Sequence, residues 1–340
     1  MAARRVWLLA LALGDGRGLK GPGMRRRALS SLSGALSRVG GSNSLRLRVG
    51  GVPEHFNTPW HTAAAKGLFE AAGLSVEWTD FPGGTGAMAT ALSDGDLDVA
   101  IGLTEGLVAA IHRGNPARLL GTYVSTPLLW GVHAHASDPS LHSMADMCES
   151  TSYAISRMGS GSHLMACVDA HARGLDPKAL QLYTAGDLRG ARSALESGFA
   201  DVFMWEKFTT KHLVDSGEWR RIGVVPTPWP CFSIAAPEHT LAECGEALLT
   251  MLQVVRSEAR ALRASEECAK TIGLMYGQHE VDIVEWLDGM QWSVQPVVSH
   301  DMLSRVMHAL ADASLLEREE LLPPAALVSH LTEDAEPGEA

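Results

Sequence analysis

The stretch Phe81–Glu105, FPGGTGAMATALSDGDLDVAIGLTE, carries the pattern that decides the fold. It predicts a strand end, a Gly-rich turn, a short helix, a tight turn and a second strand. Leu97–Ile101 is a nearly continuous apolar run, as expected of a strand buried on both faces of a parallel sheet. The loop Gly102–Gly106 follows at the carboxyl end of this strand, where open α/β sheets bind ligands. The stretch therefore predicts one wall of a ligand pocket.

The Gly-rich turn is the first candidate binding element. Gly84 and Gly86 flank Thr85, and glycines let backbone N–H groups approach a ligand closely. The helix that begins near Thr85 points its positive end at the same place, which suits an anion or a polarised carbonyl. The alternative is a plain strand-to-helix turn whose glycines serve packing.

Strands and helices alternate along the chain, which predicts an α/β fold with mostly parallel sheets and flanking helices. The strand Ser152–Ser156 leads into a second Gly/Ser turn, Arg157–Ala166, and a helix, so the second half repeats the first in outline. Two similar lobes are expected, each aiming a helix N-terminus at a common cleft. The expected organisation is a targeting segment over residues 1–44, a first lobe over 45–133, a second lobe over 134–231, a return to the first lobe with C-terminal helices over 232–330, and an acidic, disordered tail over 331–340.

Composition limits the classes of partner. The chain has 340 residues, of which 46% are hydrophobic, enough for a sizeable core in two lobes or domains. Residues 1–50 carry a net charge of +9, which leaves −20 for the rest of the chain. This acidic body argues against nucleic acid as a partner, and no apolar run is long enough for membrane insertion. The five cysteines are odd in number and form no C-x-x-C motif, so we expect reduced thiols.

The N-terminal segment has the composition of an organellar transit peptide. Residues 25–38, RRRALSSLSGALSR, are rich in Arg and Ser and contain no acidic residue. We therefore expect a mitochondrial or other organellar location. A secretory signal built on residues 6–13, VWLLALAL, with a secreted or periplasmic location, is the alternative, and a disordered tail with no address is a third possibility.

The second half offers the opposite wall of the pocket. Ser160, Gly161, Ser162 and His163 place hydroxyls at a helix N-terminus, and His163 could sense ligand charge. The alternative is an ordinary helix cap with an exposed histidine. At the end of a later strand, Trp205 could stack on a ligand ring with Glu206 beside it as an acceptor, or Trp205 could belong to the core and Glu206 to a cap.

Other candidates lie between these two walls. Thr104 and Glu105 follow the buried strand, and Glu105 could bind an ammonium or hydroxyl group, or simply favour the helix dipole. If Glu105 faces the cleft, a zwitterion or a ring with donors suits the site better than a pure anion. Trp229, among three prolines, is a candidate lid at the hinge or a wedge between the lobes. His55 and Asn57 lie at the mouth of the cleft and could touch the ligand.

Metal and cofactor chemistry have little support in the sequence. His133 and His135 could share one face of a strand, but a zinc site needs a further ligand and none is near in sequence. No nucleophile elbow, H-E-x-x-H motif, Walker loop or dinucleotide fingerprint is present. We therefore expect neither a metal nor a cofactor.

The segments TPWHTAAAKGLFEAAGLSVEW (58–78) and GTGAMATALSDGDLDVAIG (84–102), with the late strand and helix, resemble the type-2 periplasmic solute-binding proteins. The similar branch holds alkanesulfonate, taurine and nitrate receptors and the thiamine-pyrimidine precursor synthases. The motifs EHFNTPW, GTGAM, GLTEG and TPWPCF also resemble a small group of stand-alone members of uncertain ligand. The resemblance, over roughly residues 45–320, implies a two-lobed fold that closes over a small molecule, with a permease partner only if the protein is exported in a bacterium.

The sequence departs from the synthases of that branch. Asp96 stands where those enzymes carry the lysine that binds pyridoxal phosphate, the loop GLTEG has no histidine, and the cysteine run is absent. Synthase chemistry is therefore not expected. The leading hypothesis is a non-catalytic protein that binds an anionic or zwitterionic small molecule as a receptor, sensor or carrier. The alternatives are an enzyme that acts on a pyrimidine-like or small carboxylic substrate, with Glu105, His163 or Glu206 as acid or base, and a protein whose cleft is vestigial.

Overall fold

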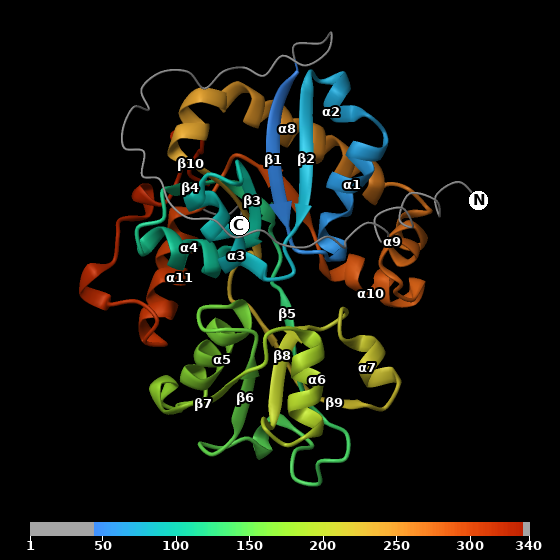
Figure 1. Ribbon diagram of the computed structural model, residues 1–340, viewed down its shortest axis with the longest axis vertical. Helices are drawn as coiled ribbons and strands as arrows, with labels where there is room; N and C mark the ends of the chain where they lie inside the picture. The colour runs from blue at the N-terminus through green and yellow to red at the C-terminus, as the bar shows by residue number, and fades with distance from the viewer. Residues whose placement is uncertain (1–43, 336–340) are drawn as a thin grey trace, which may run out of the picture. The chain divides into compact units, whose positions relative to one another are not determined.

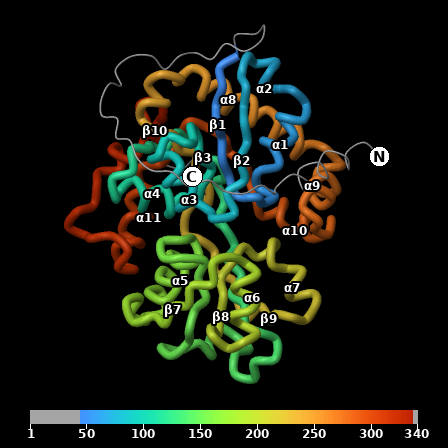
Figure 2. The backbone as a smooth tube through the Cα atoms, viewed as in Figure 1, coloured from blue at the N-terminus to red at the C-terminus, as the bar shows by residue number. Residues whose placement is uncertain are grey.

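The structure is a computed structural model that describes residues 44–335, drawn as a ribbon in Figure 1 and as a backbone tube in Figure 2. The expected targeting segment and the last residues of the expected tail lie outside the described residues.

The first sheet has six strands in the order β11-β4-β10-β3-β1-β2. Four of them, β1 to β4, run in one direction, whereas β10 and the edge strand β11 run the opposite way. Their bounds are β1 (Leu45–Gly51), β2 (Leu74–Asp80), β3 (Val99–Leu103), β4 (Ala117–Val124), β10 (Phe232–Pro237) and β11 (Trp292–Gln295).

The second sheet has five strands in the order β7-β6-β8-β5-β9. Only β5 opposes the direction of the others, because it pairs antiparallel with both β8 and β9. The bounds are β5 (Leu129–His135), β6 (Ser152–Ile155), β7 (Gln181–Thr184), β8 (Val202–Glu206) and β9 (Trp219–Pro226). We call the part built on the first sheet the first lobe and the part built on the second sheet the second lobe, the upper and lower parts of Figure 1.

The α/β fold class is confirmed, with two corrections of detail. The sheets are mixed rather than mostly parallel, because the chain crosses between the lobes twice and each crossing feeds a reversed strand, β5 or β10. The first crossing lies at residues 125–128 and not at the expected boundary after residue 133, since β5 belongs entirely to the second sheet. The second crossing lies at residues 227–231.

Helices cover both sheets. The longest, α8, packs against α1 and β11, and α11 contacts both α4 and α5. The α-helices are α1 (Thr58–Ala65), α2 (Leu68–Ala71), α3 (Gly84–Asp94), α4 (Thr104–His112), α5 (Gly161–Ala172), α6 (Leu188–Glu196), α7 (Lys211–Asp215), α8 (Glu238–Arg263), α9 (Cys268–Tyr276), α10 (Glu280–Gly289) and α11 (His300–Asp312). Short 3-10 turns are η1 (His55–Asn57), η2 (Met144–Asp146), η3 (Pro177–Ala179), η4 (Arg318–Glu320) and η5 (Pro324–Ala326). No helix of the described residues is long and apolar enough to cross a membrane.

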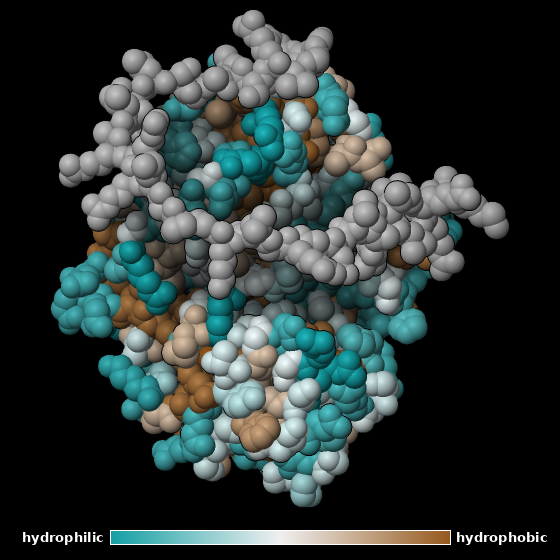
Figure 3. All heavy atoms as spheres, in the orientation of Figure 1, coloured by the Kyte–Doolittle hydropathy of each residue, from teal (hydrophilic) through white to brown (hydrophobic). Residues whose placement is uncertain are grey.

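Local sequence explains the central elements. The apolar run that forms most of β3 is completely buried, as expected for a strand covered on both faces. Gly95, in a left-handed conformation with φ of 75°, ends α3 just before it. In the second lobe, α6 buries Ala191, Ala194 and Leu195 against its sheet, and hydrophilic side chains cover the face of that lobe around α6 and α7 in Figure 3.

The start of the expected disordered tail is ordered. The Thr332 hydroxyl donates to the backbone carbonyls of Leu119 and Leu120, at 3.0 and 3.1 Å. Glu333 forms a bridge with Val297. Thr332 is therefore held against β4, and Glu333 against the segment that follows β11.

Candidate functional site

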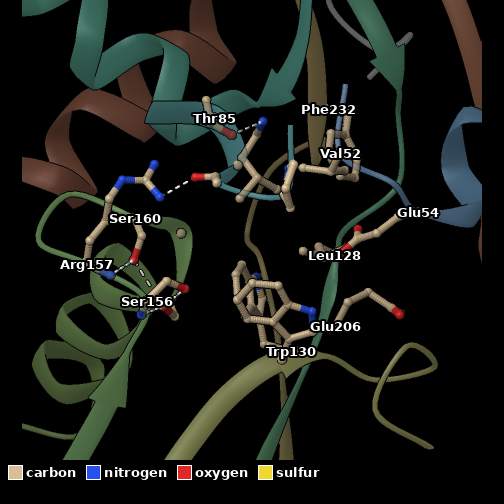
Figure 4. A pocket seen from close by; sticks show the side chains of 17 residues that line it. Val52, Glu54, Thr85, Leu128, Trp130, Ser156, Arg157, Ser160, Glu206 and Phe232 are labelled. Carbon is tan, nitrogen blue, oxygen red and sulfur yellow. Dashed lines mark hydrogen bonds between the residues drawn. The ribbon is translucent and has the colours of Figure 1, made fainter. Parts of the chain in front are cut away.

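A cavity of about 520 Å³, including space open to solvent, lies between the two lobes (Figure 4). Its lining residues are Val52, Glu54, Pro82, Gly83, Gly84, Thr85, Leu103, Leu128, Trp130, Ser156, Arg157, Ser160, Gly161, Ser162, Trp205, Glu206 and Phe232.

Strand direction explains why these residues meet. The first lobe contributes residues that follow β1 and β2 and the last residue of β3, and the second lobe contributes residues that follow β6 and end β8. These are the carboxyl ends of strands that share one direction, where α/β sheets bind ligands. The reversed strands β5 and β10 reach the same place with their beginnings and so contribute Trp130 and Phe232.

Thr85 shapes the wall on the first lobe. Its hydroxyl oxygen accepts a hydrogen bond from the Leu103 amide at 2.9 Å, which ties the start of α3 to the end of β3. Gly84 precedes it with φ of 69°, a conformation that favours glycine. The amino end of α3 is thereby held at the cavity.

Arg157 reaches across from the second lobe to this wall. Its Nη1 donates to the Gly83 carbonyl, and its Nη2 is buried with no hydrogen-bond partner among the described residues. The guanidinium occupies the space where a side chain at position 86 would begin, so Gly86 serves the site by leaving room for Arg157 although it does not line the cavity. Burial lowers the pKa of Arg157.

Three serine hydroxyls form the facing wall. Ser162 Oγ accepts from the Ser156 amide at 3.0 Å and lies 3.0 Å from Ser160 Oγ and 3.2 Å from Ser156 Oγ. Ser160 is also the N-cap of α5 and accepts from the His163 amide. Gly161 allows α5 to approach Leu103 and Trp130, because a side chain there would overlap both.

Two carboxyl groups line the other side of the cavity. Glu206 is 3% exposed, and its Oε2 accepts from the Phe208 amide and from the amide and hydroxyl of Thr209, at 3.0, 2.6 and 2.8 Å. Among residues 44–335, Glu206 Oε1 forms no hydrogen bond. The side chain of Glu54 forms none either within this part of the chain. Burial raises the pKa of Glu206. Burial and the charge of Glu206 raise the pKa of Glu54 to about 8.

Aromatic side chains form the apolar part of the lining. Trp130 is 3% exposed and its indole Nε1 has no partner in the described part of the chain. Trp205 stacks on Phe203 with ring centroids 5.3 Å apart and also reaches the cavity. Phe232 lies on the first-lobe side, near Val52, in Figure 4.

The structure brings together half of the residues that the sequence singled out. Lining the cavity are Gly84, Thr85, Ser160, Gly161, Ser162, Trp205 and Glu206. His163 is buried beside them but accepts from the Gly159 amide at 3.0 Å and lies 3.7 Å from Cys167 Sγ. Burial lowers its pKa.

The candidates near the crossings lie behind the cavity. The Trp229 indole donates to Glu105 Oε2 at 2.8 Å, and both side chains are buried. Thr104 is fully buried and bonds the hydroxyl of Ser233 at 2.8 Å. These residues hold the second crossing against α4 and do not line the cavity.

The two candidates after β1 also point away from the cavity. Asn57 donates from Nδ2 to the Val52 carbonyl at 2.7 Å, and so shapes the turn that presents Glu54. His55 is buried among Phe56, Tyr276 and Trp286, and burial lowers its pKa to about 3. Neither lines the cavity.

The histidine pair of β5 is split between core and surface. His133 is buried and lies 3.0 Å from the Thr210 hydroxyl, whereas the ring of His135 lies 2.7 Å from the Ser137 hydroxyl. Among residues 44–335, no group of three His, Cys, Asp or Glu side chains could hold a metal ion.

Sequence reasoning missed several lining residues. Glu54 was visible in the turn after β1, and Arg157 begins the second Gly/Ser turn, so both carried a positional signal. No positional signal in the sequence marked Leu128, Trp130 or Phe232. They reach the cavity only because of the crossings and the reversed strands.

Two family models match adjacent parts of the chain, the NMT1-like family over residues 40–132 and Ca3427-like PBP over residues 130–225. No curated protein matches the chain.

Several solved structures share the fold. The Candida albicans CA3427 gene product, described as defining a new family with the generic periplasmic binding protein fold, is 26% identical with a TM-score of 0.78, over 86% of this chain and 99% of that chain. The alkanesulfonate-binding protein SsuA of Xanthomonas axonopodis pv. citri, bound to MOPS, is 16% identical with a TM-score of 0.67, over 83% of this chain and 97% of that chain. The aliphatic sulphonate binding protein SsuA of Escherichia coli is 16% identical with a TM-score of 0.64, over 84% of this chain and 97% of that chain.

Proposed function

This chain belongs to the type-2 periplasmic binding protein family, and from that premise we propose that it is a small-molecule binding protein whose two lobes close over a ligand. The observation that carries the proposal is the cavity between the lobes, built from the carboxyl ends of β1, β2, β3, β6 and β8. The amino ends of α3 and α5 and the aromatic rings of both lobes meet there. Each lobe supplies part of the contact surface, so a ligand that touches both would favour their closure.

The role that suits this site is reversible binding, as a receptor, sensor or carrier. Of the three acid–base candidates for an enzyme, only Glu206 lines the cavity. Glu105 accepts a hydrogen bond from Trp229, and His163 contacts Gly159 and Cys167. The Arg- and Ser-rich composition of residues 25–38 supports an organellar location, where we propose a sensor or carrier.

The test is a binding assay on the full chain. Native mass spectrometry of protein purified without added ligand, followed by denaturing release, identifies any small molecule that travels with it. A thermal-shift screen with sulfonates, pyrimidines and amino acids follows. A compound at about 100 times its Kd stabilises the folded state by about 2.7 kcal/mol.

A matched pair of variants assigns the binding to this cavity. Gly86→Ala should weaken binding, because the added methyl group would displace the Arg157 guanidinium. Gly289→Ala, at the end of α10, adds the same methyl group where nothing lies nearby and should bind like the wild type. A protein that carries no small molecule and responds to no compound in the screen contradicts the proposed function.

A further inference from the structure

We propose that the cavity takes a small zwitterion, with its cationic group at Glu54 and Glu206 and its anionic group at Arg157 and the serine cluster. The inference rests on the proposed binding function and names the class of ligand. It follows from the separation of charge along the cavity. In Figure 4, Arg157, Ser156 and Ser160 lie on one side, Glu54 and Glu206 lie on the other, and Trp130 stands between them.

The two acids on one side form no ion pair among the described residues, and the neighbouring Lys207 pairs with Glu285 instead. Glu54 has no side-chain hydrogen bond, and Glu206 leaves Oε1 free while backbone and hydroxyl donors hold Oε2 in place, among the residues that the structure describes. Two carboxylates in one cavity repel each other, and within residues 44–335 neither forms an ion pair with Lys or Arg. A proton can neutralise the pair in the empty protein, and a ligand ammonium can replace that proton. The raised pKa of Glu54, about 8, agrees with this arrangement.

The opposite side of the cavity carries a positive charge that has no acidic partner among the described residues. Arg157 is half-buried and bonds only a neutral carbonyl through its side chain, so its charge is uncompensated within residues 44–335. The hydroxyls of Ser156, Ser160 and Ser162 and the amino end of α5 add donors and positive potential. A carboxylate, sulfonate or phosphate group would satisfy them.

The middle of the cavity is apolar and favours a ligand with an apolar part between its two charged groups. Trp130 and Trp205 offer flat apolar faces, with Leu128, Phe232 and Val52 completing the walls. The buried Trp130 Nε1 adds one donor without a partner in the described chain. A pure anion would leave the two acids to be neutralised by a bound proton, without a charge-assisted contact, and a pure cation would leave Arg157 uncompensated. A compact molecule with both charges and an apolar body satisfies both ends.

The experiment compares a zwitterion with molecules of similar shape that carry only one of its two charged groups. Full-length protein is titrated calorimetrically with para-aminomethylbenzoate, para-methylbenzoate and para-methylbenzylamine, and with the aliphatic set δ-aminovalerate, valerate and pentylamine. We expect one zwitterion to bind at least about tenfold more tightly than the anion and the amine of its set, since each lost charge-assisted contact costs about that much. Glu54→Gln should reduce the preference for the zwitterion over the anion, and Arg157→Gln should reduce its preference over the amine.

The controls separate the failure of this inference from the failure of the proposed function. Glu77→Gln removes an exposed carboxylate that pairs with Arg46 on the first sheet, and should leave binding unchanged. Thermal melts show whether each variant is folded. An anion or an amine that binds as tightly as its zwitterion overturns the inference and leaves the binding function standing. An unaltered preference in both folded variants overturns it too. If no compound of either set or of the wider screen binds, the proposed function itself fails.

Discussion

Glu105 shows how one buried carboxyl can make stability depend on pH. Its side chain is 0% exposed, Oε2 accepts from the Trp229 indole, and Oε1 has no partner among the described residues. Burial raises its pKa to about 7, from an ordinary value of 4.5. Between these two pH values the folded protein binds more protons than the unfolded chain, so this group makes stability fall as the pH rises through that range. Glu54 acts in the same direction up to about pH 8.

We therefore predict that Glu105→Gln flattens the pH dependence of stability. The amide keeps an acceptor for Trp229 and cannot ionise. At pH 8 the Tm of the variant should exceed that of the wild type by about 2–4 °C, since about 1 kcal/mol moves the Tm of a chain of this size by that much. At pH 4.5 the two proteins should melt together. Differential scanning calorimetry across this range measures the effect.

The exposed Glu243 on α8 provides the control. Glu243→Gln removes the same charge from the surface and should follow the wild-type curve. Equal slopes for Glu105→Gln and the wild type would mean that Glu105 is ionised in the folded protein at neutral pH.

At the scale of elements, the helix that follows β6 joins stability to the site. Ser160 caps α5 and lines the cavity, whereas Ser299 caps α11 in the same way, accepting from the Met302 amide at 3.2 Å, and does not line it. We predict that Ser160→Ala and Ser299→Ala each lower the free energy of unfolding by about 1 kcal/mol. Only Ser160→Ala should also weaken the binding of para-aminomethylbenzoate, or of the compound that binds best in the screen.

Denaturant unfolding and calorimetric titration of the same preparations measure both quantities. Equal losses of affinity in the two variants would trace the effect to general destabilisation. An unchanged affinity in Ser160→Ala would remove the serine cluster from the proposed binding surface.

Elements with local signals could be predicted from the sequence. The apolar run at Leu97–Ile101 predicted a strand, observed as β3 (Val99–Leu103), and Thr85 marked the start of α3 to within one residue. The C-terminal helices expected over residues 232–330 include α8. These elements depend on periodicity, glycine positions and capping, which a short window of sequence contains.

The remaining errors come from long-range pairing. Strand β5 was assigned to the first lobe because nothing within it shows that its partners are β8 and β9. Trp130 and Phe232 were therefore missed as lining residues. Glu105 illustrates a different limit, which concerns the direction of a side chain. Its place in the first turn of α4 was predicted correctly. Its side chain, however, points toward Trp229, which lies in the second crossing, far away in sequence.

At the scale of the whole molecule, ion pairs join the lobes beside the cavity. Lys207, just after β8, pairs with Glu285 of α10 at 2.5 Å, and Lys211 of α7 pairs with Asp282 of α10 at 3.3 Å. Lys207 and Lys211 belong to the second lobe and α10 to the first. These pairs therefore stabilise the arrangement in which both walls can contact one ligand, on the side of the cavity that holds Glu54 and Glu206.

We predict that Glu285→Gln weakens ligand binding by up to about fivefold at low salt, because a partly exposed pair contributes about 0.2–1 kcal/mol. High NaCl should weaken binding to the wild type and reduce the difference between the two proteins, since salt screens the pair.

The matched control is Glu77→Gln, which breaks a pair of 2.6 Å between β1 and β2 within the first lobe and should not change affinity. Small-angle X-ray scattering of the free and bound forms would show whether the variant shifts the population toward separated lobes. Equal affinity of Glu285→Gln and the wild type at low salt, with equal scattering, would mean that the lobes keep this arrangement without this ion pair, through their remaining contacts, such as those of α5 with α4 and α11, the pair Lys211–Asp282 and the hydrogen bond from Arg157 to Gly83.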